Sequence, residues 1–228
     1  ETTTQDEKCG IAYVGDLPQI SALDDYTPNT ITRVFASNGK VIGEFATERR
    51  VIVTYGDISP RLRQAILSAE DADFEKHVGV SVSRLVITAV QDVLKQRLWG
   101  ASTLTQQLAR KLFLTDEKTW ERKVKEAVLA IQIEKRYTKQ EIFTLYCNQM
   151  YWGHGAYGVE AASRLYFNKR SKDLTLDEAA LIAGIIQTPE RQSPYVDMRR
   201  AMRRRNYVLR QMAEEGYITP AEANAAMQ

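Results

Sequence analysis

Apolar residues recur every three or four positions over most of this chain, which is the spacing of amphipathic helices. The pattern begins after Pro60 and continues to the C-terminus, with Gly and Pro at the joints. Four predicted helices each have an apolar stripe that we expect to face inward: Leu62, Ala65, Ile66 and Ala69; Val82, Leu85, Val86, Ala89, Val90 and Val93; Leu104, Leu108 and Leu112; and Trp120, Val124, Val128 and Ile131. Further helices are predicted at 138–148, 158–166, 176–186, 198–213 and after Pro220. Thr103 with Gln106 predicts a capping box for the third helix, and Thr119 a cap for the fourth. There is no βαβ alternation and no internal repeat, so we expect a mainly α fold.

The first quarter of the chain has a different pattern. Residues 1–29 are polar and contain two prolines, which predicts a tail or linker. From Ile31, two β-rich runs flank Asn38-Gly39, a strong hairpin signal, and Val51–Val53 is compatible with a third strand. We therefore expect one domain over 30–228, with a β-hairpin appendage at 30–55 and a helical body at 56–228.

Composition narrows the class of protein only slightly. The chain has 228 residues, 44% of them hydrophobic, and a net charge of +2, so global charge indicates no partner. A basic run at 199–210 is either a solvated helix face or a surface for an anionic headgroup. Two cysteines are too few for a disulfide framework, and the two histidines have no Cys or His at the spacing of zinc ligands, which argues against a zinc site. No apolar run is long enough to span a bilayer and the chain does not begin with Met, so we expect a piece of a longer polypeptide.

One carboxylate interrupts an apolar helix row. Leu62, Ile66, Glu70 and Phe74 are spaced four apart, so Glu70 lies where the apolar stripe should continue. Burial raises the pKa of a carboxyl group, as a general base working near neutral pH requires. The alternative is a partly exposed glutamate at a helix end, paired with an arginine.

The segment G-A-S-T-L-T-Q-Q-L-A-R-K places several polar side chains on one side of the third helix, namely Ser102, Thr103, Gln106, Gln107 and Arg110. Their amides and hydroxyls suit sugar hydroxyls or phosphate oxygens, and a helix N-terminus near Ser102 favours an anion. A capped, solvated surface helix is the alternative.

The segment E-R-K-V-K-E places two cations within reach of one acid. Lys123 and Arg122 precede Glu126 by three and four residues, and an apolar run follows Glu126, which makes its partial burial plausible. An ordinary salt-bridged helix is the alternative. The glycines in W-G-H-G-A-Y-G match neither nucleotide fingerprint and indicate a helix joint instead.

Together these segments resemble the peptidoglycan glycosyltransferase domain (glycosyltransferase family 51) of class A penicillin-binding proteins and monofunctional transglycosylases. Glu70–Gly79 resembles E-D-x-x-F-x-x-H-x-G, Gly100–Leu108 resembles G-G-S-T-I-T-Q-Q, and Arg122–Glu126 resembles R-K-x-x-E. Tyr146–Phe167 and Leu176–Pro189 are similar to the fourth and fifth motifs, and Arg205–Met212 to the helix that follows. Ser81, Ala101, Arg110 and Cys147 depart from the family pattern.

The resemblance implies a lysozyme-like, two-lobed helical fold with a groove between the lobes, and polymerisation of lipid II into glycan strands. It implies that Glu70 is the general base on the acceptor hydroxyl and that undecaprenyl pyrophosphate leaves with inversion. Glu126, with Lys123, Lys125 and Arg110, would lie on the donor-diphosphate side, where Glu126 could also ligate Mg or Mn. Substrate contacts carry over to Asp71, Phe74, His77, Ser102, Thr103, Gln106, Gln107 and Asn148. No nucleotide cofactor is implied.

The resemblance implies that the partners are lipid II, the growing glycan strand and the membrane surface, and that nucleic acid is not a partner. It implies that the protein acts at the outward face of the bacterial plasma membrane. The parent protein would carry the anchor and a fused transpeptidase domain. The apolar helix at 82–93, with Leu98 and Trp99, would either lie on the bilayer or pack in the core. A lysozyme-like hydrolase and a non-catalytic scaffold are the rivals. The lysines of R-K-V-K-E favour synthesis, because a hydrolase has little use for a diphosphate site.

Overall fold

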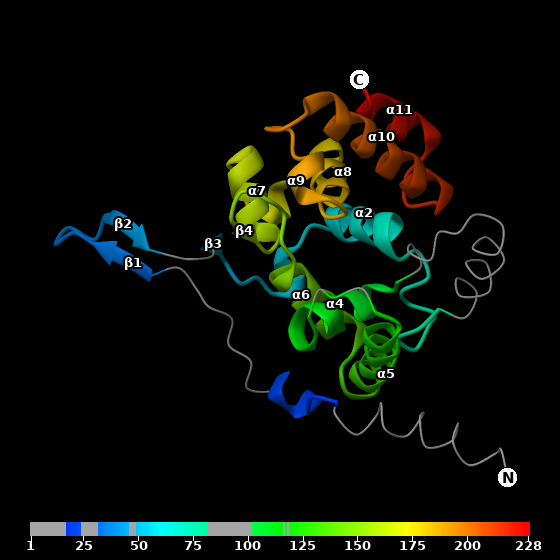
Figure 1. Cartoon of the computed structure of the whole chain (residues 1–228). Coiled ribbons are helices and arrows are strands. Elements are labelled where there is room, and N and C mark those ends of the chain that lie inside the picture. Colours follow the sequence, from blue (N-terminus) through cyan, green and yellow to red (C-terminus); the bar gives the residue numbers. More distant parts are fainter. Residues whose placement is uncertain (1–16, 24–31, 46–48, 82–101, 116, 118) are drawn as a thin grey trace, which may run out of the picture. The chain divides into compact units, whose positions relative to one another are not determined.

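The computed structural model describes residues 17–23, 32–45, 49–81, 102–115, 117 and 119–228 (Figure 1). The chain divides into two compact units. The first comprises Glu1–Thr27 and Phe74–Ile142, and the second comprises Pro28–Asp73 and Phe143–Gln228. The predicted helix at 82–93, with Leu98, Trp99 and Ala101, lies outside the described residues.

The first unit is built on two packed helices, α4 (Leu104–Phe113) and α5 (Trp120–Arg136). The side chains of Thr103 and Thr119 accept hydrogen bonds from the first turns of these helices, and Thr103 forms the predicted capping box with Gln106. A 3-10 helix at Ile20–Leu23 contacts α5 and buries both of its end residues. Part of the segment expected to be a tail is therefore ordered against the helical body.

The predicted inward face of α5 is wrong. Trp120 and Val124 are 70% and 49% exposed, whereas the buried side carries Arg122 and Glu126, followed by Leu129, Ala130 and Ile133. Periodicity counts only apolar residues, so it misses a face whose first two turns are buried as an ion pair.

The second unit surrounds helix α8 (Leu176–Ile185), in which every residue from Ala179 to Ile185 is buried. Helices α2 (Pro60–Glu70), α7 (Val159–Phe167) and α10 (Met198–Glu214) contact α8, and α11 (Pro220–Ala226) contacts α10. Helix α6 (Lys139–Gln149) begins in the first unit and ends in the second, and a short helix α9 is found at Pro189–Gln192. The helices predicted in this region are confirmed to within a few residues, and with them the mainly α class.

The predicted hairpin is confirmed as β1 (Thr32–Phe35) and β2 (Val41–Phe45), which pair antiparallel across a turn where Gly39 has φ +76°. The third strand is β3 at Arg49–Arg50, not Val51–Val53, and it pairs in parallel with β4 (Ala156–Tyr157). The N–H and C=O of Val53 bond instead to the Asn148 amide, at 3.0 and 2.9 Å. These bonds satisfy the Val53 backbone without a neighbouring strand. Within the described part of the chain, no helix has the length and apolar content to cross a membrane.

Candidate functional site

A buried carboxylate with two cations lies at the start of α5. Glu126 is only 2% exposed, and its two oxygens face Arg122 and Lys123, with Lys123 Nζ 2.9 Å from Oε2. Lys123 also donates to the Ser102 hydroxyl, just before α4, and Arg122 donates to the Glu117 carbonyl. The spacing argument for this trio is confirmed. Two cations on one carboxylate leave a net positive charge in the cluster.

The ammonium of Lys123 holds its proton less tightly than that of an ordinary lysine. Its pKa is lowered to about 8, first by burial and then by the charges of Arg122 and Arg110. Arg110, in the last turn of α4, is exposed but close enough to act on Lys123. Lys125 forms its ion pair with Glu121, at 2.9 Å, instead of with Glu126. The cluster can therefore offer two charge-assisted donors and one readily transferred proton to an anion.

The surroundings of Glu126 do not fit a divalent cation. Both of its oxygens are occupied by cationic side chains, which repel a metal ion. Among the described residues, no three His, Cys, Asp or Glu side chains form a group that could hold a metal. Since Mg²⁺ and Mn²⁺ prefer several oxygen ligands, we assign no step to a metal here.

The predicted polar strip on α4 divides into two parts. Thr103 and Gln106 are buried and bond to each other's backbone, so both side chains serve the helix start. Ser102 binds Lys123, Gln107 is half-buried, and Arg110 is exposed. The cap predicted as the alternative thus accounts for two of the five residues.

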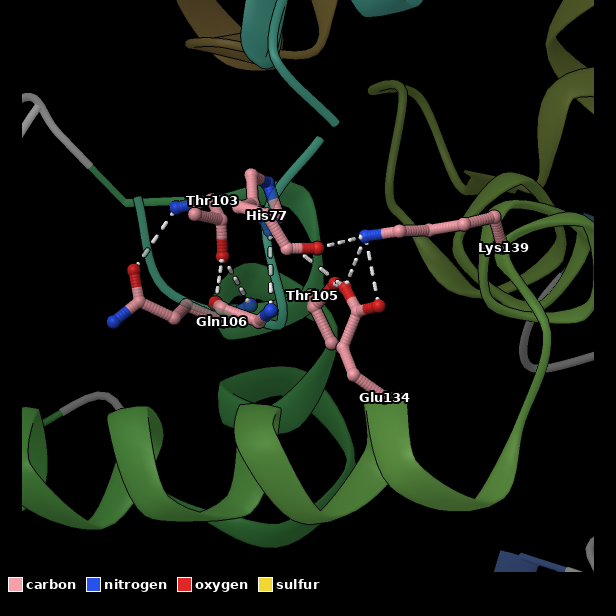
Figure 2. A network of polar contacts seen from close by, with 7 residues as sticks. His77, Thr103, Thr105, Gln106, Glu134 and Lys139 are labelled. Atoms are coloured by element: carbon pink, nitrogen blue, oxygen red, sulfur yellow. Dashed lines mark hydrogen bonds and ion pairs between the residues drawn. The ribbon is translucent and has the colours of Figure 1, made fainter. Parts of the chain in front are cut away.

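The loop after α2 lies on α4 and α5 (Figure 2). Thr103 Oγ1 donates to the Gly79 carbonyl at 2.6 Å. Gly79 has φ +95°, and a Cβ there would lie 2.7 Å from the Ala130 backbone, so only glycine permits this approach. Gly79 N–H donates to His77 Nδ1 at 3.1 Å, so this ring nitrogen is the acceptor in a bond within the loop.

A second buried carboxylate, which we did not predict, organises this loop. Glu134 on α5 accepts from Thr105 at 2.6 Å and pairs with Lys139 at 2.8 and 2.7 Å (Figure 2). Lys139 also donates to the His77 carbonyl at 2.7 Å and lies 4.4 Å from the centre of the Phe74 ring. Phe74 and His77 meet edge to face. The only signal in the sequence was that Glu134 follows Glu126 by two helical turns.

In the second unit, Glu70 is the last residue of α2. Its side chain is 11% exposed, and Arg204 of α10 lies 4.0 Å from Oε1. Glu70 thus combines features of both sequence hypotheses, a nearly buried carboxylate and an arginine partner. The raised pKa expected for Glu70 stays a prediction.

Two further predicted site residues belong to this unit. Asp71 follows Glu70 as the fully buried C-cap of α2. Asn148 uses both ends of its amide to hold Val53, which is a structural role. Of the residues that depart from the family pattern, Ser81 and Cys147 are buried, and Cys147 is a free thiol.

Comparison with known proteins identifies the family of this chain. Residues 38–213, most of the chain, match the family described as Transglycosylase. The chain belongs to the transglycosylase family.

Relatives of this transglycosylase include penicillin-binding protein 1A of Aquifex aeolicus, 42% identical over 93% of the chain, and of Pseudomonas aeruginosa, 40% identical over 93%. The chain spans only 29% and 26% of these proteins. A crystal structure of penicillin-binding protein 1A from Haemophilus influenzae is similar over 87% of the chain and 20% of that protein, with 27% identity and a TM-score of 0.50. The resemblance and the lysozyme-like helical class predicted from the motifs are both confirmed.

Proposed function

We propose that this transglycosylase domain is a peptidoglycan glycosyltransferase that polymerises lipid II. Glu70 removes the proton from the 4-hydroxyl of the acceptor sugar. The resulting oxygen attacks the anomeric carbon of the growing strand, whose bond to undecaprenyl pyrophosphate breaks with inversion. Family membership supports the reaction class, and the relatives' names, penicillin-binding protein 1A, support a role in cell-wall synthesis.

The observation that carries the proposal is the cluster of Arg122, Lys123 and Glu126. A departing diphosphate gains negative charge, so it is stabilised by donors already fixed where that charge develops. Glu126 orients both cations without cancelling their combined charge. Lys123, with a pKa of about 8, supplies a proton or a strong hydrogen bond to the leaving oxygen. Arg110 adds charge from α4, whereas Lys125 contributes less directly because Glu121 neutralises it.

The acceptor side rests on Glu70. Its near-burial limits access of water, and the neighbouring Arg204 helps to orient the carboxylate. His77 and Gln107 are proposed substrate contacts by their motif positions. Asp71 and Phe74, the other two residues of that set, are 0% and 1% exposed, so we propose that they support the site from behind. Thr103, Gln106 and Asn148 act instead by supporting the backbone around the site.

The remaining parts of the proposal concern the whole protein. We propose that it acts at the outward face of the bacterial plasma membrane on lipid II and the growing strand, and that the longer parent also carries a transpeptidase domain. The much greater length of the relatives supports the last point.

The decisive test is incubation of the chain with labelled lipid II, with and without Mg²⁺, Mn²⁺ or a chelator, followed by separation of polymer from monomer. We expect polymer from the wild type and none from Glu70→Gln. Glu178→Gln, which changes a carboxylate paired with Lys169, is the matched control and should stay active. Fragments released from finished peptidoglycan, without polymer from lipid II, would identify a hydrolase instead.

A further inference from the structure

The structure assigns Lys139 and Glu134 as a positioning pair for the loop Phe74–Gly79. This inference rests on the proposed function, because that loop carries His77, a proposed substrate contact, and begins with the buried ring of Phe74 that supports it. Neither member of the pair is among the residues proposed to touch substrate.

Lys139 joins α5 to the loop through its ammonium group. Its Nζ donates to the His77 carbonyl at 2.7 Å and to Glu134 Oε1 at 2.8 Å, and the same ion pair brings Glu134 Oε2 to 2.7 Å. Its charge also lies over the Phe74 ring at 4.4 Å. Lys139 therefore holds both the backbone and a side chain of the loop.

Glu134 in turn fixes Lys139. Its side chain is 5% exposed and is held by the Thr105 hydroxyl at 2.6 Å, so the carboxylate has a defined position on α5. A buried carboxylate requires a cation, which keeps the flexible lysine in one conformation. The far end of the loop is anchored separately, since Thr103 binds the Gly79 carbonyl.

Because the two ends of the loop are anchored separately, removing Lys139 and Glu134 should affect catalysis and folding to different extents. Without Lys139, Gly79 stays attached to α4, but the His77 carbonyl loses this donor and the Phe74 ring loses the cation beside it. The loop backbone at His77 is then held less firmly, so the position of His77 becomes less well defined while the packing of α4 against α5 is retained. The loss should appear in turnover of substrate more than in folding.

The test uses the double variant Glu134→Leu/Lys139→Met, because replacing both members of a buried ion pair with apolar residues tends to preserve stability. We expect a fall in kcat/KM for lipid II of at least about tenfold, at a temperature where circular dichroism shows the variant folded. Lys139→Met alone should lose at least as much, and Lys139→Arg should recover part of the activity. The control is Lys169→Met, which breaks a lysine–glutamate pair whose lysine is 41% exposed, and should stay within about twofold of wild type.

A folded double variant with wild-type kcat/KM would overturn the positioning role and show that the pair is only structural. If the double variant does not fold, the decision passes to Lys139→Arg. Full activity with the planar guanidinium, which cannot reproduce the compact contact of the ammonium with both Glu134 and the His77 carbonyl, would also overturn it. A wild type that makes no polymer refutes the proposed function instead, so the two failures are distinguishable.

An independent feature is the exposed side of α10. Arg199, Arg203, Tyr207 and Arg210 follow one another at intervals of three or four residues and are all exposed, so they form one stripe. The opposite side of the helix is buried. At its N-terminal end Tyr195, Val196 and Met198 are 62%, 57% and 58% exposed.

We propose that this stripe binds the headgroups of an anionic phospholipid bilayer. Arg200 pairs with Asp197, but within the described part of the chain no acidic side chain pairs with Arg199, Arg203 or Arg210. Guanidinium groups match phosphate, and exposed apolar side chains at one end of a basic helix are typical of an interfacial surface.

Flotation with vesicles tests this surface. We expect the wild type to bind phosphatidylglycerol–phosphatidylcholine vesicles, to bind pure phosphatidylcholine weakly, and to dissociate with salt. The triple variant Arg199→Gln/Arg203→Gln/Arg210→Gln should lose at least about tenfold in partition coefficient. The control is the triple variant Arg164→Gln/Arg170→Gln/Lys172→Gln, which removes the same charge from α7 and the segment after it. Its partition coefficient should differ from that of the wild type by less than about twofold. Equal losses in both variants, or no vesicle binding by the wild type, would overturn the proposal.

Discussion

The ionisation of Lys123 predicts an alkaline limit on polymer formation. Its pKa is lowered to about 8 because the ammonium is buried and lies near the charges of Arg122 and Arg110. Roughly nine-tenths of the Lys123 side chains then carry a proton at about pH 7, but only about a tenth at about pH 9. The protonated form stabilises the departing diphosphate, so kcat/KM should fall about tenfold per pH unit above that pKa. A lysine with an ordinary pKa would impose no such limit until about pH 10.

Lys123→Arg isolates this cause. Arginine stays protonated at every accessible pH, so the variant should lose the alkaline decline even if its planar fork lowers the absolute rate. Initial rates of polymer formation from labelled lipid II between about pH 6 and about pH 10 give both profiles. Lys169→Arg, at an exposed lysine paired with Glu178, is the control and should keep the wild-type profile. A wild-type rate that stays constant through about pH 9.5, or a parallel decline in Lys123→Arg, would refute the reasoning.

Three further predictions concern single residues. Glu70→Gln should retain lipid II binding and lose at least about 100-fold in polymerisation, because an amide cannot accept the proton; unchanged activity would assign the base elsewhere. Gly79→Ala should lower the free energy of unfolding by about 2–4 kcal/mol in urea denaturation, since its Cβ would lie 2.7 Å from the Ala130 backbone at a positive φ. A loss below about 0.5 kcal/mol would contradict the close approach. Cys147 is buried and burial raises its pKa well above the ordinary value, so a maleimide should label it only on unfolding. Labelling at equal rates in buffer and in denaturant would contradict its burial.

Local signals in the sequence predicted local structure well. The caps at Thr103 and Thr119 and the hairpin at Asn38-Gly39 depend on bonds between residues a few positions apart, so their geometry follows from residue type. Motif order was equally informative about family. Conversely, Val51–Val53 is composed like a strand, but the partner of Val53 is Asn148, 95 residues away.

Burial of charge was decided by tertiary structure. The apolar pattern of α5 predicted that Trp120 and Val124 face inward, yet Arg122 and Glu126 lie buried there as an ion pair. Counting apolar positions alone gives no weight to a charged pair, so the stripe of Trp120 and Val124 was assigned to the core although the buried side begins with Arg122 and Glu126. The spacing of three and four residues named the pair correctly, and the apolar run after Glu126 indicated its burial; only the stripe drawn through Trp120 and Val124 was wrong.

The sequence by itself determined the helices, their caps, the family and the first proposed base, Glu70. Only the tertiary structure revealed that Glu134 and Lys139 hold the loop that follows it, since Lys139 meets His77 across 62 residues of chain. It also decided that Thr103 and Gln106 close a helix start and that Asn148 fastens Val53. The physical reason is that a side chain's role depends on which group satisfies its charge or hydrogen bonds. For a buried side chain, the group that satisfies its charge or hydrogen bonds often lies on a distant segment, so it is known only once the packing of those segments is known.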